Sequence, residues 1–343
     1  MLHLITEDKQ KQNCQKTLAK NLRKFMSNIG ERQIGYPGDN EFVTMFKNNR
    51  TNLWFVAKTI TPKKGTKKLW NAFGIFNKDI RSHNIVVEAN IPLKTNAQNV
   101  AGFFAKEQIT GRIYLLHTGK IGGGAKGVSK SNFLRTTTLK LVDVHDPNGK
   151  TRKGIVLGPI DDALVINEGV LNFANHVIEF KKAAREGSLK TDDGLSTENQ
   201  FDDQYTAEFS GLKSGKRRED FDYYTYHGII VDNLVRYRKG QGLYEGEHIS
   251  NDAKIDLKVI KNGKITEIYE VKTSSVRQVL YTAIGQLMTH SCGKAAINKR
   301  TLVIPKSSPL DSDFRLTLSE HNIKVQYFNL KRTKHKINVD FLD

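Results

Sequence analysis

The feature that most constrains the fold of this chain is a strand, turn and strand pattern centred on Asn262-Gly263. Two runs rich in Val, Ile and Tyr flank this dipeptide, at residues 253–260 and 265–273. Asn-Gly is a preferred pair in two-residue hairpin turns because both residues tolerate positive φ angles. The sequence therefore predicts a β-hairpin, and the apolar spacing that follows predicts a helix over Val276–Ser291.

Two acids and a lysine occupy defined positions in this hairpin. Glu270 and Lys272 alternate along the second strand, so both side chains point to one face while Val271 points into the core. The tight turn brings Asp256, in the first strand, beside them. Two converging carboxylates repel each other, and Mg²⁺ relieves that repulsion by accepting one or two carboxylates with water and a phosphate oxygen. We therefore expect Asp256, Glu270 and the Val271 carbonyl to bind Mg²⁺, for which Mn²⁺ can substitute.

Lys272 completes a chemically plausible centre. Its ammonium can neutralise charge that develops on a phosphate, or it can orient or deprotonate the attacking water. Together with the carboxylates it predicts hydrolysis of phosphodiester bonds.

These residues resemble the motif of the PD-(D/E)XK nuclease superfamily, which has the restriction-endonuclease-like fold. The match consists of Asp256, thirteen residues of hairpin, then Glu270-Val271-Lys272 and the following helix. The resemblance implies metal-binding roles for Asp256 and Glu270 and a catalytic role for Lys272. Ile255 departs from the pattern, because the family often has proline before the aspartate.

A second element on the predicted helix adds to the resemblance, which covers about residues 222–330. The segment Tyr281–Leu287 is similar to an additional glutamine motif found in several branches of the superfamily. The similarity implies that Gln286 faces the metal site and takes part in catalysis. The N-terminal half of the chain shows no such resemblance.

Composition along the chain indicates four segments. Apolar residues at helical spacing predict an N-terminal helix within residues 1–30, and short runs of Val, Ile, Phe and Tyr predict a mainly β domain over 31–180. Polar residues with scattered Gly and Ser indicate a linker at 181–221. Residues 222–343 are expected to form the nuclease domain, an α/β unit with a mixed β-sheet flanked by helices.

The helix expected at residues 222–238 offers further polar groups. The resemblance implies an acidic or polar residue near the metal here, and His227 or Asp232 could take that position. His227 could equally be an ordinary histidine of a helix whose other residues form the core. Glu245 and Glu247, in the glycine-rich segment before the hairpin, are weaker candidates.

The charge of the chain favours an anionic partner. It has 54 Lys and Arg residues against 36 Asp and Glu, a formal net charge of +18. Residues 42–78 contain eight basic residues and no acid, and residues 108–142 contain six and no acid. Basic stretches inside folded segments suit a phosphate-binding surface, so double-stranded DNA is the expected partner. An acidic protein or a membrane surface is the alternative.

Two segments are candidates for contact with DNA. The glycine-rich segment at residues 117–133 combines backbone N–H groups that can approach phosphate with Lys120, Lys126 and Lys130. Trp70 lies beside Lys67 and Lys68, where an indole could stack on a base or line a pocket for a flipped base, although most aromatics in strands belong to the core. Asn71, Glu88 and Asn90 could read base edges or occupy ordinary surface and turn positions.

Nothing in the sequence indicates export or a membrane span. No apolar run reaches the roughly 18 residues that a membrane helix needs, and Glu7 and Asp8 stand where a signal peptide would be apolar. Cys14 and Cys292 provide neither a disulfide framework nor a zinc motif. We expect a cytoplasmic protein with reduced thiols.

The resulting hypothesis is a Mg²⁺-dependent DNA endonuclease of the restriction type. Its N-terminal domain would recognise a specific site or a modified base, and a homodimer would supply the two centres that double-strand cleavage requires. A repair or recombination nuclease acting on DNA ends or structures is one alternative. An RNA nuclease and a non-catalytic DNA-binding protein are the others.

Overall fold

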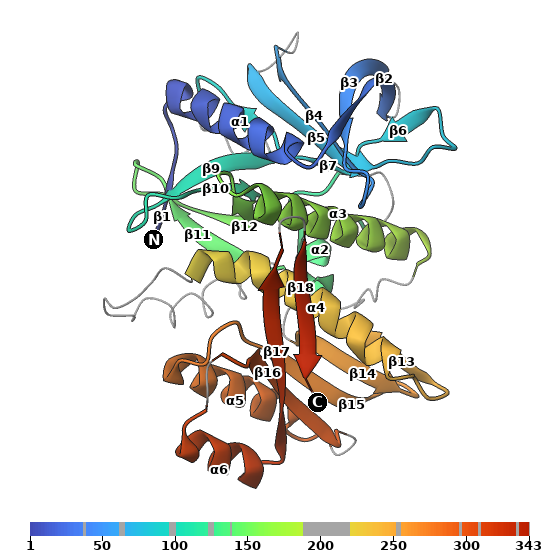
Figure 1. Cartoon of the computed structure of the whole chain (residues 1–343), viewed down its shortest axis with the longest axis vertical. Helices are drawn as coiled ribbons and strands as arrows, with labels where there is room; N and C mark the ends of the chain where they lie inside the picture. The colour runs from blue at the N-terminus through green and yellow to red at the C-terminus, as the bar shows by residue number, and fades with distance from the viewer. Residues whose placement is uncertain are drawn as a thin grey trace.

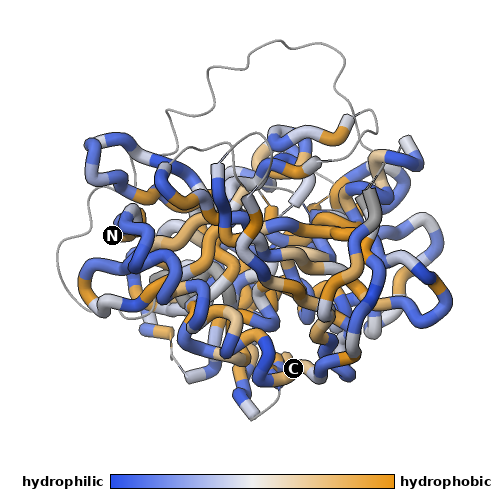
Figure 2. The backbone as a smooth tube through the Cα atoms, turned by 90° about the horizontal axis from the view of Figure 1, so that it is seen from above, coloured by the Kyte–Doolittle hydropathy of each residue, from blue (hydrophilic) through white to orange (hydrophobic). Residues whose placement is uncertain are grey.

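The computed structural model describes residues 1–36, 39–61, 66–95, 101–122, 127–137, 139–187, 220–251, 255–294, 297–307, 310–333 and 336–342. Within these ranges the chain is a mixed α/β protein with six helices and three β-sheets. Figure 1 shows two of the sheets in the upper half and the third in the lower half, with the long helices α3 (Ala163–Arg185) and α4 (Asp220–Gly240) between them. In Figure 2 apolar segments run through the interior and hydrophilic segments lie mostly at the periphery.

A closed five-stranded barrel contains the N-terminus. Strand β1 (Leu2–Leu4) closes it, because it pairs in parallel with β11 and antiparallel with β9. Leu2 is fully buried in the barrel interior, together with Phe103 and Leu116. The remaining barrel strands are β9 (Gly102–Glu107), β10 (Ile113–His117), β11 (Leu141–His145) and β12 (Thr151–Pro159).

The second sheet is curved and has apolar residues on both faces. One face packs with helix α1 (Asp8–Arg23) and α3 in the largest core, and Phe55, Phe73 and Phe173 belong to it. The other face holds Trp54 and Trp70 in a smaller core of its own. Its strands are β2 (Ser27–Tyr36), β3 (Asp39–Lys47), β4 (Leu53–Ile60), β5 (Lys68–Ile75), β6 (Ser82–Asn84), β7 (Val87–Glu88) and β8 (Ile91–Pro92).

The third sheet carries the residues that the hairpin pattern singled out. Its strands follow chain order: β13 (Glu247–Ser250), β14 (Leu257–Lys261), β15 (Lys264–Val271), β16 (Lys299–Pro305), β17 (Ile323–Arg332) and β18 (Ile337–Leu342). Strands β15, β16 and β17 are parallel, connected by α5 (Arg277–Ser291) and α6 (Ser312–Glu320). Helix α4 packs on one face of this sheet, while α5 and α6 pack on the other.

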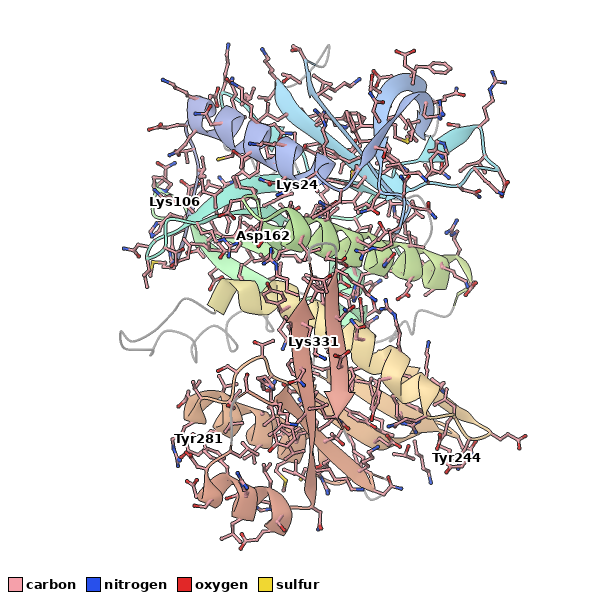
Figure 3. All side chains as sticks on the ribbon, in the orientation of Figure 1. Lys24, Lys106, Asp162, Tyr244, Tyr281 and Lys331 are labelled. Atoms are coloured by element: carbon pink, nitrogen blue, oxygen red, sulfur yellow. The ribbon has the colours of Figure 1, made fainter. Side chains whose placement is uncertain are left out.

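Helix α3 joins the upper and lower halves. It packs against α4, and its first residues share an apolar cluster with Ile229 of α4 and Ile337 of β18. Asp162 caps α3 by accepting hydrogen bonds from the N–H groups of Leu164 and Val165. The same carboxylate accepts a 2.7 Å hydrogen bond from Arg332 at the end of β17, near Lys331, which Figure 3 labels.

The expected α/β fold class is confirmed in its coarse form, but several expected boundaries were wrong. The helix expected within residues 1–30 is present as α1, with β1 before it and β2 beginning at Ser27. The expectation of a mainly β segment over 31–180 missed α3, which Asp162 caps and whose apolar residues recur at helical spacing.

The hairpin turn itself follows the prediction. Asn262 and Gly263 have φ angles of 50° and 78°, as a type I′ turn requires. Most of the expected linker at 181–221 lies outside the described residues. No helix in the described parts of the chain is both long and apolar enough to cross a membrane.

Buried His117 gives the upper half a pH-dependent stability. Its Nε2–H group donates to the Glu88 carbonyl at 3.2 Å, and its Nδ1 accepts from the Gly119 N–H at 3.0 Å, so the neutral imidazole is fully paired. Burial lowers the pKa of His117 to about 4. As the pH falls from about 6.5 to about 4, the unfolded chain binds a proton that the folded chain does not, so stability falls by about 3 kcal/mol.

We therefore predict that His117→Asn flattens this part of the pH profile. Urea unfolding at pH 7.0 and 4.5 measures the difference in the free energy of unfolding for both proteins. His83 and His227, whose pKa values burial also lowers, remain in the variant and retain their own contributions. A difference in the variant as large as in the parent protein would contradict the assignment to His117.

Candidate active site

The hairpin brings the two predicted metal-binding carboxylates to one end of the third sheet. Asp256 lies immediately before β14 rather than inside it, and Glu270 lies in β15. The Asp256 Oδ2 accepts a 2.8 Å hydrogen bond from the N–H of Val271. This side-chain oxygen thus takes the place of a backbone partner, and β14 begins at Leu257, directly after Asp256 and later than the start of the expected run at 253–260. Both carboxylates are buried, at 3% and 2% exposure.

Lys272 contacts the second carboxylate directly. Its Nζ donates to Glu270 Oε1 at 2.6 Å and to Gln286 Oε1 at 2.8 Å. Gln286 comes from α5, on the same face of the sheet as Glu270, while Val271 packs on the opposite face against α4. The structure thus brings together the four residues that the hairpin pattern and the resemblance indicated.

Helix α4 adds His227 to the site. Its Nε2 lies 3.1 Å from Asp256 Oδ1, and both side chains are buried. Burial lowers the pKa of His227 despite the neighbouring carboxylate. The imidazole is therefore neutral at neutral pH, and its Nε2–H group donates to Asp256. This contact decides one of the open alternatives: His227, not Asp232, is the α4 residue at the carboxylates.

The barrel half of the chain supplies a residue that the sequence did not indicate for this site. Lys140 lies between α2 (Lys130–Thr136) and β11, and its Nζ is 3.9 Å from Asp256 Oδ1. The only signal in the sequence is that Lys140 is the last basic residue of the acid-free stretch at 108–142. Such a stretch does not show which other part of the chain a given lysine contacts.

The surroundings shift the pKa values of the two carboxylates in opposite directions. Burial raises the pKa of Asp256, but His227, Lys140 and Lys272 outweigh that effect and hold the pKa below its ordinary value. Burial and then the charge of Asp256 raise the pKa of Glu270 to about 7, against the opposing effect of Lys272. Asp256 is thus ionised at neutral pH. Because a second buried negative charge beside it is unfavourable, Glu270 is the carboxylate that takes up a proton more readily.

The donor set suits a hard divalent ion. Among the described residues, no three His, Cys, Asp or Glu side chains gather into a metal-binding group. Asp256 and Glu270 offer carboxylate oxygens. The N–H and C=O of one strand residue point to the same side, so the Val271 carbonyl also points towards Asp256. Two carboxylates and a carbonyl, completed by water, match the ligands of Mg²⁺.

The other acidic candidates lie elsewhere. Asp232 faces α3. Burial raises the pKa of Asp232, His176 of α3 lowers it, and Glu179 of α3 raises it. Glu247 has its carboxylate 3.6 Å from Arg238 and accepts a hydrogen bond from the Tyr244 N–H. Glu245 is exposed in the loop before β13.

The DNA-contact candidates differ in exposure. Lys67, Lys120 and Lys130 are exposed and Lys68 is half-buried, whereas Lys126 lies outside the described residues. The expectation that the Trp70 ring is accessible to a base was wrong. Trp70 is only 1% exposed, and its Nε1–H group donates to Glu88 Oε1 at 2.6 Å. Asn71 and Asn90 are buried. The Asn71 side chain donates to the Ala89 carbonyl, and Asn90 accepts from the Asn71 N–H and donates to Glu88. These groups support the sheet and are not available to read base edges.

Comparison with known proteins yields no relative. No protein-family model matches the chain, and neither the curated proteins nor the solved structures compared with it give a match.

We predict a measurable coupling between His227 and Asp256. A hydrogen bond from a neutral donor to a buried carboxylate contributes about 2 kcal/mol, so a double-mutant cycle of His227→Ala and Asp256→Ala should give a coupling energy near that value. Urea unfolding of the four proteins measures it. The matched cycle uses His248→Ala, because His248 is exposed on β13, and should give no coupling. Equal coupling in both cycles would contradict a direct contact.

Proposed function

We propose that the protein is a Mg²⁺-dependent DNA endonuclease of the restriction type, with a restriction-endonuclease-like fold over residues 222–343. The observation that carries the proposal is the meeting of two buried carboxylates, Asp256 and Glu270, with Lys272 at one end of β15. Burying two like charges side by side is unfavourable without a counter-ion, and such arrangements concentrate at functional sites.

The arrangement of the elements supports the fold assignment. Helix α4, the hairpin of β14 and β15 and helix α5 follow one another in the order that the resemblance implies. Gln286 reaches the site from α5, as the additional glutamine motif implies. The parallel pairing of β15 with β16 covers the hairpin on its other edge and makes the sheet mixed.

The residues of the chain have separable roles in the proposed reaction. Asp256, Glu270 and the Val271 carbonyl would hold Mg²⁺, which supplies Lewis-acid stabilisation of the phosphate and acidifies bound water. Lys272 lies against Glu270 and is held by Gln286, so its ammonium is positioned to stabilise charge on the phosphate. The His227 hydrogen bond holds the Asp256 carboxylate, leaving Oδ1 and Oδ2 oriented between α4 and β15.

The partner and the assembly belong to the same proposal. The acid-free basic stretches favour DNA, and exposed Lys67, Lys120 and Lys130 in them are the proposed phosphate contacts. Cleavage of both strands requires two centres, so we propose that two copies act together on DNA. Recognition of a specific site or a modified base is assigned to the N-terminal half.

We predict that Asp256→Ala, Glu270→Ala and Lys272→Met each lower the rate of Mg²⁺-dependent plasmid cleavage by at least about 100-fold, because each removes a metal ligand or transition-state charge. Asp340→Asn, which changes an exposed carboxylate on β18 paired with Lys331, is the matched control and should cleave normally. Addition of EDTA should stop cleavage. Full cleavage by the Asp256→Ala protein would place the cleaving centre elsewhere. A parent protein that binds DNA without cleaving it, with binding unchanged in Asp256→Ala, would favour a non-catalytic DNA-binding function.

The choice of substrate separates the remaining alternatives. A restriction-type enzyme gives discrete fragments, and plasmids from methylating and non-methylating hosts, together with hydroxymethylated DNA, show whether a modified base is required. Cleavage that depends on free ends or branched structures instead of sequence would favour a repair or recombination nuclease. Cleavage of RNA alone would reassign the substrate.

A further inference from the structure

Lys140 extends the candidate site into the barrel half of the molecule. It is bounded by α2 and β11, whereas every other charged residue of the site comes from α4 or the hairpin region. Its ammonium lies 3.9 Å from Asp256 Oδ1, the same oxygen that accepts from His227. The charge of Lys140 also lowers the pKa of Glu270, against the larger effect of burial. The site is therefore built from both halves of the chain.

The two lysines of the site differ in exposure and in distance from their carboxylates. The Lys272 side chain is 6% exposed, and two short hydrogen bonds fix it between Glu270 and Gln286. The Lys140 side chain is 31% exposed and lies at the longer distance from its carboxylate. A partly exposed ammonium can move into solvent by rotation about its side-chain bonds, whereas a buried one cannot.

A divalent ion on Asp256 would change the balance of charge around Lys140. Without the ion, the two ammonium groups compensate the two carboxylates. With the ion, the same carboxylates are already neutralised, and Lys140 is repelled from Asp256. The nearest favourable position for its charge is then beside an anion bound at the ion, and in the proposed reaction that anion is the DNA phosphate.

We propose that Lys140 is the counter-ion of Asp256 in the metal-free protein and a ligand of the substrate phosphate once the metal is bound. The phosphate role rests on the proposed nuclease function, whereas the counter-ion role requires only that a divalent ion binds the two carboxylates. Lys140 is thus a substrate-binding residue by which the barrel half also influences the metal site.

The proposal predicts that removal of the charge has opposite effects on two ligands. Lys140→Met should bind Mn²⁺ at least fivefold more tightly in the absence of DNA, because no ammonium has to be displaced. The same variant should bind duplex DNA at least fivefold more weakly in Ca²⁺, which permits binding measurements without cleavage. Lys140→Arg keeps the charge and should remain within twofold of the parent protein in both measurements.

The experiment uses the full chain, with calorimetric titration of Mn²⁺ and fluorescence anisotropy of labelled DNA. Lys106→Met is the matched control, since Lys106 is an exposed lysine of barrel strand β9, labelled in Figure 3, and should change neither affinity. Thermal unfolding of each variant shows whether it is folded.

Each outcome decides the proposal. Tighter Mn²⁺ binding with weaker DNA binding in Lys140→Met, restored in Lys140→Arg, supports it. Loss of both affinities would assign Lys140 a purely structural role, and unchanged affinities would remove it from the site, so either result overturns the proposal. If Asp256→Ala abolishes cleavage while Lys140→Met behaves as the parent, the nuclease function stands and only the role of Lys140 fails.

Discussion

The burial of two carboxylates at one end of β15 is the constraint around which the lower half of the molecule is organised. An isolated ionised carboxylate in an apolar interior is strongly unfavourable, and two of them side by side are more so. The structure meets this cost by directing four partners at the pair: the Val271 N–H and His227 contact Asp256, Lys272 contacts Glu270, and Lys140 approaches Asp256. Apolar side chains could fill the same space without needing charged or hydrogen-bonding partners. The buried carboxylate pair therefore indicates a function instead of a contribution to stability.

The elements around the pair follow from that requirement. The type I′ turn at Asn262-Gly263 and the register shift between Val259 and Ile260 together fix which residues of β14 and β15 face each other. Alternation along β15 then directs Glu270 to the α5 face and Val271 to the α4 face. A shift of β15 by one residue would turn Val271 to the α5 face and Glu270 to the α4 face, which would place a carboxylate in the apolar cluster under α4. The register of the hairpin and the chemistry of the site are therefore specified together.

The sequence was informative where the determining interactions are local. Turn preference, strand alternation and helix spacing act over a few residues, so the hairpin, α5 and the relation of Asp256 to Glu270 could be predicted. Interactions between distant segments could not. The spacing of α4 left open whether His227 or Asp232 faced the site, because helix phase does not reveal what covers each face. The same applies to Trp70: lysines lie close to it in the sequence, but in the folded chain its side chain packs in a buried apolar core.

The position of Lys140 bears on how two halves of one chain can act together. The barrel, α3 and the lower sheet are joined by packing of α3 on α4 and by the bond from Arg332 to Asp162. Lys140, which belongs to the barrel half, lies 3.9 Å from Asp256, so a charge from one half stands beside acids of the other. In the proposed enzyme, an anion bound across both halves would relieve the repulsion between Lys140 and the metal. Binding of the correct DNA would then favour metal occupancy, and by reciprocity metal binding would favour DNA. Recognition and cleavage are linked in that case by electrostatics at a shared site, without a change of fold.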